Sequence, residues 1–313
     1  MHVAMITRDP YYGIGYHTIK LVQFLTRSFP DLTIHTFFGL TNYNTNRLTE
    51  KLKQKYDLIH IQGTCWGAGK NSKINKKTPR ILTVHSLLKT ELKYEKNPAF
   101  LLGLPFEKKT IKKADKIIVV NQILVEELTQ NYRVPPEKIT VIPNAVDVTE
   151  FDNVSVQREN PPFIMSCGRK IKRKDFPTLI KACKKIGFPL KLFHGELSRL
   201  ELIKQYKKAL MFVCPSLYET GPITVLEAMA SRTPVICSNI PAVKNVVYDR
   251  FNGILFNPGD PDDLSEKILY LYHNFYPEGT RYAENAYNFV KEHYNWFKVA
   301  EETYRTYLEL TLK

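Results

Sequence analysis

Short, continuously apolar runs alternate with longer amphipathic segments along most of the chain. Such runs are typical of parallel strands covered by helices on both faces, because neither face of the strand meets water. In the first half the predicted strands are HVAMIT, LTIHTFF, DLIHIQ, RILTVH, KIIVVN and ITVIPN. Helical segments such as YHTIKLVQFLTRSF and QILVEELTQNY lie between them. The pattern predicts a parallel α/β domain over residues 1–150.

A polar segment that ends in two prolines, DVTEFDNVSVQRENPP, interrupts the alternation and is predicted to be a linker. The alternation then resumes with the predicted strands FIMSCG, LKLFHG, LMFVCPS, PVICS and GILFN. The helices predicted between and after them are FPTLIKACKKI, LELIKQYKKA, ITVLEAMAS and DDLSEKILYLYHNF. This second series predicts another α/β domain over residues 151–295. Two open sheets in tandem predict a cleft between them, and ligands bind such sheets beyond the carboxyl ends of the strands.

A chain of 313 residues is longer than a single hydrophobic core usually supports, which agrees with two domains. No apolar run approaches the roughly 18 residues that a membrane-spanning helix needs. The first residues, MHVAMITRDP, lack the basic region and long apolar stretch of a signal peptide and are predicted to form a strand. We therefore expect a cytoplasmic protein whose contact with a membrane, if any, is peripheral.

The cysteines are odd in number, widely spaced and mostly set in apolar runs. No CxxC pair and no Cys/His cluster has the spacing of metal ligands. We expect free, buried thiols in a reducing compartment at all five positions, Cys65, Cys167, Cys183, Cys214 and Cys237.

The formal net charge of +14 is unevenly distributed. Residues 1–150 contain 22 Lys and Arg against 13 Asp and Glu, a balance of +9, and the remainder carries +5. A basic surface favours an anionic partner, which can be a nucleic acid, an anionic lipid or a phosphorylated metabolite. Charge alone does not choose among these.

The stretch PSLYETGPITVLEAMA places two glutamates, Glu219 and Glu227, around a Gly-Pro turn directly after an apolar strand. The turn through Gly221, Pro222 and Ile223 begins a helix, and its backbone N–H groups form a natural anion site, most simply for phosphate. Carboxylates on both sides of a phosphate are suited to accept hydrogen bonds from hydroxyls of a ribose and of a sugar. Alternatively, both glutamates are solvated surface residues.

This stretch resembles the Glu-x7-Glu motif of retaining GT-B glycosyltransferases of family 4, the glycosyl transferases group 1. Four further segments resemble that family in the expected order: VIPNAVDVTEF, CGRKIKRKDFPTLIKA, NGILFNPGDPDDLSEKI and YNWFKVAEETYRTY. The resemblance implies two Rossmann-like parallel-sheet domains with the cleft between them. It also implies a C-terminal helix over residues 296–313 that packs back on the first domain. The implied activity is hexosyl transfer from a nucleoside-diphosphate sugar to an acceptor hydroxyl with retention of anomeric configuration.

The resemblance also assigns roles to single residues. It implies that Glu219 contacts the hydroxyls of the donor sugar and that Glu227 holds the nucleotide ribose. Arg169 and Lys174 match the family's Gly-Arg-x4-Lys pattern and would stabilise the negative charge that develops on the departing diphosphate. The other members of this basic run are predicted to be solvated, namely Lys170, Lys172 and Arg173.

In the first domain, His85 ends a predicted strand, where the family commonly has a histidine near the reacting carbon of the donor. His60 is predicted to be a packed strand residue. Gly13 and Gly15 form a GxG between the first strand and helix. This loop is either a tight turn or, as the family implies, a contact to the diphosphate through backbone N–H groups.

Neither a metal nor a further cofactor is expected. The one Asp-x-Asp, at Asp260 and Asp262, is predicted to cap a helix. No carboxylate is obviously placed as a glycosyl nucleophile, so the family's same-face displacement assisted by the leaving phosphate is the expected mechanism. The sequence departs from the family at Asp175, where a Gly is usual, and at Gly221-Pro222, where Phe-Gly is usual. The second domain also lacks a Gly-rich turn, which leaves the base open between uridine and guanosine.

Other activities remain open at this stage. A nucleotide-sugar epimerase or a glycan phosphorylase would keep the fold and change the chemistry, and a nucleic-acid-binding protein would explain the charge. No interleaved aromatic and basic platform favours nucleic acid. The segment FEKKTIKKADK predicts a helix with one basic face, opposite Ile111 and Ala114. That face is either solvated or a docking surface for an anionic membrane that carries a lipid acceptor; its lysines are Lys108, Lys109, Lys112, Lys113 and Lys116.

Overall fold

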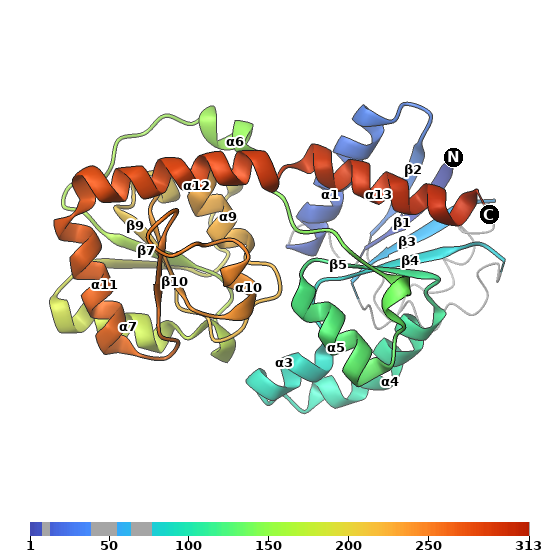
Figure 1. Ribbon diagram of the computed structural model, residues 1–313, viewed down its shortest axis with the longest axis horizontal. Helices are drawn as coiled ribbons and strands as arrows, with labels where there is room; N and C mark the ends of the chain where they lie inside the picture. The colour runs from blue at the N-terminus through green and yellow to red at the C-terminus, as the bar shows by residue number, and fades with distance from the viewer. Residues whose placement is uncertain (8–12, 39–54, 64–76, 313) are drawn as a thin grey trace. The chain divides into compact units, whose positions relative to one another are not determined.

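The computed structural model describes residues 1–7, 13–38, 55–63 and 77–312. These residues fold into two compact units, each built around its own sheet (Figure 1). Unit 1 comprises residues 1–144 and 296–313, and unit 2 comprises residues 145–295. The division falls a few residues before the boundary expected at residue 150.

The described part of unit 1 contains a six-stranded, fully parallel sheet with the strand order β2-β1-β3-β4-β5-β6. Each predicted strand is present and is shorter than the apolar run by a residue or more. The strands are β1 (His2–Ile6), β2 (Thr33–Phe37), β3 (Leu58–Gln62), β4 (Arg80–Val84), β5 (Lys116–Val119) and β6 (Ile139–Val141). Gln62 pairs with Thr83 in the ladder between β3 and β4, so the carboxyl ends of these two strands lie side by side.

Helices of unit 1 cover this sheet, and one of them comes from the far end of the chain. They are α1 (Ile14–Ser28), α3 (Leu88–Glu95), α4 (Ala99–Lys113), α5 (Gln122–Tyr132), α13 (Trp296–Thr311) and the short η2 (Pro136–Lys138). Helix α13, red in Figure 1, packs on α1 through stacked aromatic rings. Phe29 lies 3.9 Å from Tyr304 and Phe24 lies 6.2 Å from Trp296, measured between ring centroids.

The basic face predicted around FEKKTIKKADK is partly wrong. Helix α4 ends at Lys113 because Ala114 adopts an extended backbone conformation, and Lys116 is the first residue of β5. Lys116 instead pairs with Glu309 of α13, with Nζ and Oε2 3.1 Å apart. Ile111 and Ala114 are buried, as predicted for the opposite side.

In its described residues, unit 2 contains a five-stranded parallel sheet with the order β11-β10-β9-β7-β8. The strands are β7 (Ile164–Cys167), β8 (Leu190–Phe193), β9 (Met211–Cys214), β10 (Val235–Ser238) and β11 (Ile254–Phe256). The longer helices are α7 (Phe176–Ile186), α8 (Arg199–Lys208), α9 (Ile223–Ala230), α11 (Pro261–His273) and α12 (Thr280–His293). Shorter turns of helix are α6 (Val148–Asp152), η3 (Lys172–Lys174), α10 (Pro241–Lys244) and η4 (Phe275–Gly279).

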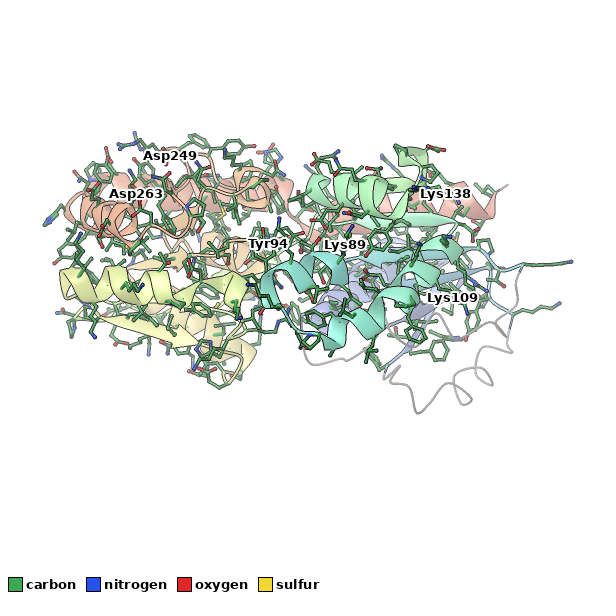
Figure 2. The ribbon with its side chains drawn as sticks, turned by 90° about the horizontal axis from the view of Figure 1, so that it is seen from below. Lys89, Tyr94, Lys109, Lys138, Asp249 and Asp263 are labelled. Atoms are coloured by element: carbon green, nitrogen blue, oxygen red, sulfur yellow. The ribbon has the colours of Figure 1, made fainter. Side chains whose placement is uncertain are left out.

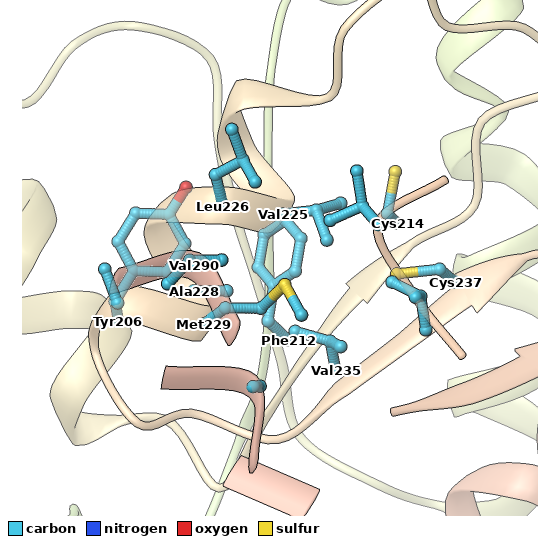
Figure 3. Packing of buried hydrophobic residues seen from close by; sticks show 14 of the residues in the cluster. Tyr206, Phe212, Cys214, Val225, Leu226, Ala228, Met229, Val235, Cys237 and Val290 are labelled. Atoms are coloured by element: carbon cyan, nitrogen blue, oxygen red, sulfur yellow. The ribbon is translucent and has the colours of Figure 1, made fainter. Parts of the chain in front are cut away.

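Helix α9 is held by one of the two cores of unit 2 (Figure 3). Its residues from Val225 to Ala230 are all buried, and Met229 lies in the same cluster as Phe212 of β9 and Val235 of β10. Gly253 permits close packing at this point, since a Cβ there would lie 2.7 Å from a methyl carbon of Val235. This packing fixes the direction in which α9 leaves the sheet, and hence the position of the turn before it.

The predicted linker over residues 147–162 contains a helix that the sequence analysis missed. Asp147 begins α6 as its N-cap, because its carboxylate accepts a hydrogen bond from the backbone N–H of Thr149. Phe151 is fully buried in the core of unit 2. The segment was predicted to be a linker because it is mostly polar, but Phe151 packs the start of unit 2 into its core.

Four cysteines are free and buried, as expected; they are Cys167, Cys183, Cys214 and Cys237. Cys65 lies outside the described residues. None of the described helices combines the length and apolar character that crossing a bilayer requires.

The packing of α13 on unit 1 can be tested with Trp296, whose side chain is 2% exposed. Trp296→Ala should lower the free energy of unfolding of unit 1 by about 3–5 kcal/mol through lost contacts and a cavity. The neighbouring Phe297 is 51% exposed, so Phe297→Ala should cost clearly less. Hydrogen exchange of amides in β1, β3 and β4 would measure the effect on unit 1. Equal protection in both variants would mean that α13 adds no stability through this ring.

Candidate active site

The loop between β9 and α9 brings Glu219 to the carboxyl edge of the sheet of unit 2. The Glu219 carboxylate is 5% exposed, so the interpretation as a solvated loop residue is wrong. Its Oε1 atom accepts hydrogen bonds from Lys174 Nζ at 2.5 Å and from Ser216 Oγ at 2.7 Å. Arg173 Nη1 lies 3.7 Å from the other carboxylate oxygen. The loop therefore presents a buried carboxylate with two cations beside it.

Lys174 and Glu219 each stabilise the charged form of the other. Burial alone would raise the pKa of Glu219, but the attraction of Lys174 and Arg173 outweighs it and holds this pKa below its usual range. Burial would likewise lower the pKa of Lys174, and Glu219 raises it above its usual value. Both groups are consequently charged at neutral pH, as a binding site for a polar ligand requires.

Lys174 reaches this carboxylate because the chain turns sharply after β7. Gly168, directly after that strand, has φ +144°, and a Cβ there would lie 3.2 Å from Lys174 Cε. A glycine is therefore required where the aliphatic stem of Lys174 crosses the backbone. Helix η3 then presents Lys174, and the left-handed backbone of Asp175 (φ +43°) leads into α7. The family's usual glycine at this position is explained by that conformation, which Asp tolerates better than most residues.

The carboxylate of Asp175 stabilises the start of α7. Its Oδ2 atom accepts a hydrogen bond of 2.7 Å from the hydroxyl of Thr178, in the first turn of α7. A negative charge is favourable at that helix end. These contacts explain how a carboxylate is tolerated at a position where the family usually has glycine.

Arg173 was predicted to be solvated, and that prediction is wrong. Arg173 is 8% exposed, and in addition to its approach to Glu219 its guanidinium donates to the carbonyl of Tyr218 at 3.4 Å. The Arg173 carbonyl accepts from the backbone N–H of Leu217. Arg173 thus joins the end of β7 to the loop that carries Glu219. Its place in a run of basic residues gave no signal of this role, whereas Lys170 and Lys172 are exposed as predicted.

Arg169 lies two residues beyond the end of β7 and is exposed. Its backbone carbonyl accepts from the N–H of Ile171 at 2.9 Å, which closes the turn toward η3. Arg169 and Lys174 therefore both come from the segment that follows β7.

The Gly-Pro turn is tighter than the sequence suggested. Helix α9 begins at Ile223, and Pro222 is its N-cap. The backbone N–H of Ile223 donates to the carbonyl of Gly221 at 2.8 Å, so this N–H already has a partner within the turn. Pro222 is buried, and Gly221 and Ile223 are partly exposed. A phosphate contact at Gly221, Pro222 and Ile223 stays a prediction.

Glu227 lies inside α9 and is 6% exposed, so it is not a solvated helix residue either. One of its oxygens accepts a hydrogen bond from Arg199 Nη1 and the other accepts from the hydroxyl of Tyr206 at 3.0 Å. Arg199, at the start of α8, also donates twice to one oxygen of Glu150, at 3.0 and 3.1 Å. The Tyr206 hydroxyl also lies 3.0 Å from Cys167 Sγ. These partners, which the motif does not contain, fix the orientation of Glu227.

In unit 1, His85 follows β4, and its Nε2 atom lies 3.0 Å from Oε1 of Gln62. His60 is fully buried in β3, as predicted, and its ring hydrogen-bonds to Tyr307 and Thr83. The edge of the His17 ring packs against His85, with centroids 4.8 Å apart. Neither Gln62 nor His17 was predicted to lie beside His85.

The GxG pair forms the start of α1. Gly13 is the N-cap of this helix, and its carbonyl accepts from the N–H of His17 at 3.0 Å. Gly15 lies in the first helical turn and is buried. The GxG therefore begins a helix and is not a separate tight turn, and a contact to diphosphate stays a prediction.

The Asp-x-Asp is a helix cap, as predicted. Asp260 Oδ1 accepts hydrogen bonds from the backbone N–H groups of Asp262 and Asp263 at 2.9 and 3.1 Å. Within the described ranges, no three His, Cys, Asp or Glu side chains come together as metal ligands would.

Both parts of the chain match models of known glycosyltransferase families. Residues 3–150 match the family Glycosyltransferase Family 4, and residues 191–289 match Glycosyl transferases group 1. An uncharacterized glycosyltransferase of Methanocaldococcus jannaschii is 29% identical over 95% of this chain and 91% of its own length. Alpha-maltose-1-phosphate synthase of Mycolicibacterium smegmatis is 23% identical over 99% of this chain and its own full length.

Solved structures show the same fold. Sucrose-phosphate synthase from Thermosynechococcus elongatus has a TM-score of 0.83 at 18% identity and covers 100% of this chain and 99% of its own. Anabaena HepE in complex with UDP has a TM-score of 0.72 at 14% identity, with 98% and 99% covered. The two units are thus the Rossmann-like parallel-sheet domains of a GT-B fold. The chain belongs to the glycosyl transferases of group 1.

Proposed function

We propose that the protein transfers a hexosyl group from a nucleoside-diphosphate sugar to an acceptor hydroxyl, with retention of anomeric configuration and without a metal ion. The observation that carries this proposal is the buried Lys174–Glu219 pair at the carboxyl edge of the unit 2 sheet. Relatives with the same fold support the donor class, because Anabaena HepE has been crystallised with UDP and with UDP-glucose. Retention is proposed from the resemblance to family 4.

Unit 2 is proposed to hold the donor. The ionised Glu219 carboxylate can only accept hydrogen bonds, which suits the hydroxyls of a sugar. An ammonium group has three N–H bonds, so Lys174 can pair with Glu219 and also contact a diphosphate oxygen. Arg169, from the same segment, is the second cation proposed for the diphosphate. Glu227 is proposed to accept hydrogen bonds from the ribose, with Arg199 and Tyr206 keeping its oxygens in place.

The proposed rate enhancement comes from charge that grows during the reaction. As the bond between sugar and phosphate breaks, negative charge accumulates on the departing diphosphate. Cations that are already fixed in place stabilise this charge more in the transition state than in the bound donor. Glu219 holds the ammonium group of Lys174, so little reorganisation is needed when the bond breaks. His85 is proposed to take part in the reaction, as the resemblance to family 4 implies.

An acceptor at an anionic membrane is the proposed explanation for the basic surface of unit 1. On α4, which Lys109 marks in Figure 2, Lys108, Lys109 and Lys112 are exposed. The same helix exposes two apolar side chains, Leu101 and Leu102, by 52% and 68%. Basic residues next to exposed leucines suit a surface that is negatively charged outside and apolar beneath.

The first prediction for this function concerns nucleotide binding. UDP or GDP at a hundredfold excess over its dissociation constant should add about 2.7 kcal/mol to the free energy of unfolding, because it binds only the native state. Glu227→Gln keeps the size of the side chain but removes its charge, so it should reduce this stabilisation. Thermal unfolding with and without nucleotide measures both effects. Glu284→Gln is the control, since the exposed carboxylate of Glu284 pairs with Arg232 in the same unit. Equal nucleotide effects in wild type and Glu227→Gln would remove Glu227 from the site.

A second prediction concerns the cations. Activity should survive EDTA, and Arg169→Ala should lower turnover on the order of 10² or more, as does the loss of other preorganised donors. Lys170→Ala, which removes an adjacent exposed charge, is the matched control. Lys174→Ala should lower turnover similarly and also destabilise the fold by about 3–5 kcal/mol, because it leaves Glu219 buried without its partner. Full activity of a folded Arg169→Ala enzyme would contradict this assignment.

A third prediction concerns the membrane. The protein should sediment with anionic liposomes at low salt and remain in solution with neutral ones, since each lysine near the surface contributes about 1 kcal/mol. Replacing four lysines of α4 by Gln should abolish sedimentation and spare nucleotide binding; they are Lys108, Lys109, Lys112 and Lys113. The control removes the same charge from exposed positions in unit 2, namely Lys181, Lys184, Lys185 and Lys244. Failure of the wild type to bind anionic liposomes would favour a soluble acceptor.

A further inference from the structure

A group of buried polar side chains lies beneath the carboxyl ends of β3 and β4 in unit 1. His60 and Gln62 are fully buried in β3, and Thr83 of β4 is 2% exposed. His17 of α1 is 5% exposed and packs between the rings of His85 and Trp296. Burying polar groups costs free energy unless they are hydrogen-bonded. The hydrogen bonds of this cluster therefore define how its members are protonated.

One of the two orientations of the Gln62 amide places its NH2 group beside Met5 Sδ. Its Nε2 atom lies 3.7 Å from Met5 Sδ and 3.2 Å from His60 Nε2. A thioether sulfur has no proton to donate, so the group beside Met5 is the amide NH2. The other amide atom, Oε1, lies 3.0 Å from His85 Nε2 and can only accept. With the amide in this orientation, His85 carries its proton on Nε2.

His60 extends the same chain of hydrogen bonds. The amide N–H of Gln62 and the hydroxyl of Thr83, 2.7 Å away, both face His60 Nε2, which places the lone pair of the ring there. The proton of the neutral ring is then on Nδ1, which lies 2.7 Å from the hydroxyl of Tyr307 on α13. Each neutral imidazole has one donor and one acceptor nitrogen, so the tautomers of His60 and His85 are fixed together.

The electrostatics of the cluster favour neutral rings. Burial lowers the pKa of His85 to about 4. Burial, and then the charge that His85 would carry, lower the pKa of His60 to about 3. Burial, His85 and His60 together lower the pKa of His17 well below its usual value. The titratable groups that face His85 across this cluster thus include His17 from α1 and His60 from β3. Tyr307 from α13 lies beyond His60, and burial raises its pKa.

We propose that Gln62 is a positioning residue that holds His85 as a neutral imidazole with its proton on Nε2. In this form Nδ1 of His85 can accept a hydrogen bond and cannot donate one. A neutral ring carries no positive charge, and this limits the part that His85 can take in the proposed reaction. The catalytic consequence rests on the proposed function of His85, whereas the protonation state of the ring does not.

The decisive variant is Gln62→Glu, which keeps the shape of the side chain and adds a negative charge. A carboxylate can still accept the Nε2 proton of His85, but it favours the charged imidazolium. The pKa of His85 should rise into the range between about 5 and 8. Because the pKa is raised, His85 becomes charged as the pH falls through this range, and kcat should fall with it. The wild-type His85 should show no titration there.

The protonation state is measured by NMR of the full-length protein labelled with ¹⁵N-histidine. Wild type should show one neutral Nε2–H tautomer for His85 from about pH 5 to 8. Gln62→Met, of similar size but without an acceptor for this proton, should give mixed tautomers. It should also lower kcat roughly tenfold or more, by analogy with other outer-shell partners of functional histidines. Tyr56→Phe is the control, because it removes the partner of a different histidine of this sheet, His35.

The outcomes separate the two proposals. A wild-type His85 that is charged or carries its proton on Nδ1 at pH 7 would overturn the inference, as would unchanged His85 signals in Gln62→Met. Nucleotide binding is proposed to depend on unit 2, so the thermal stabilisation by UDP or GDP should be the same in wild type and Gln62→Met. Loss of that stabilisation in the wild type would contradict the proposed function and leave the tautomer result intact.

Discussion

The buried ion pair between Lys174 and Glu219 is the interaction on which the candidate site of unit 2 depends. Removing both charges from water is costly, and the cost is offset only by close geometry and by further hydrogen bonds. Ser216 and Arg173 supply further contacts to the Glu219 carboxylate. Gly168 has no side chain, so the stem of Lys174 can pass close to its backbone. The pair ties the segment after β7 to the loop after β9. Segments that follow two neighbouring strands, but are distant in sequence, are thereby held together at the same edge of the sheet.

The two units differ in the charge of the polar side chains at the carboxyl ends of their strands. At the carboxyl edge of the unit 2 sheet, Lys174 and Glu219 remain charged because the attraction between them offsets the free-energy cost of burying each charge. Beneath the carboxyl ends of β3 and β4 in unit 1, burial lowers the pKa values of three imidazoles, and repulsion from neighbouring rings lowers those of His17 and His60 further.

Much of the fold could be predicted because its signals are local. Helix α5 begins and ends at the predicted residues, since Asn121 caps its first turn. Helix α7 also has its predicted bounds, and its proline stands at the second helical position, where a missing N–H is tolerated. Partners across the fold could not be predicted in this way. Arg173, Arg199 and Gln62 act through residues of distant elements, and nothing in their own neighbourhoods distinguishes them from surface residues. Lys116 was misplaced for a related reason, because helical periodicity does not reveal where α4 stops.

The measurement that tests the central claim most directly is the product formed from a panel of nucleotide sugars. Purified protein should release the nucleoside diphosphate from at least one UDP- or GDP-linked sugar, by transfer to an acceptor or, more slowly, to water. This result would follow from stabilisation of a departing diphosphate by Arg169 and Lys174. Release of sugar 1-phosphate, epimerisation of the sugar without release, or no reaction with any member of the panel would contradict it.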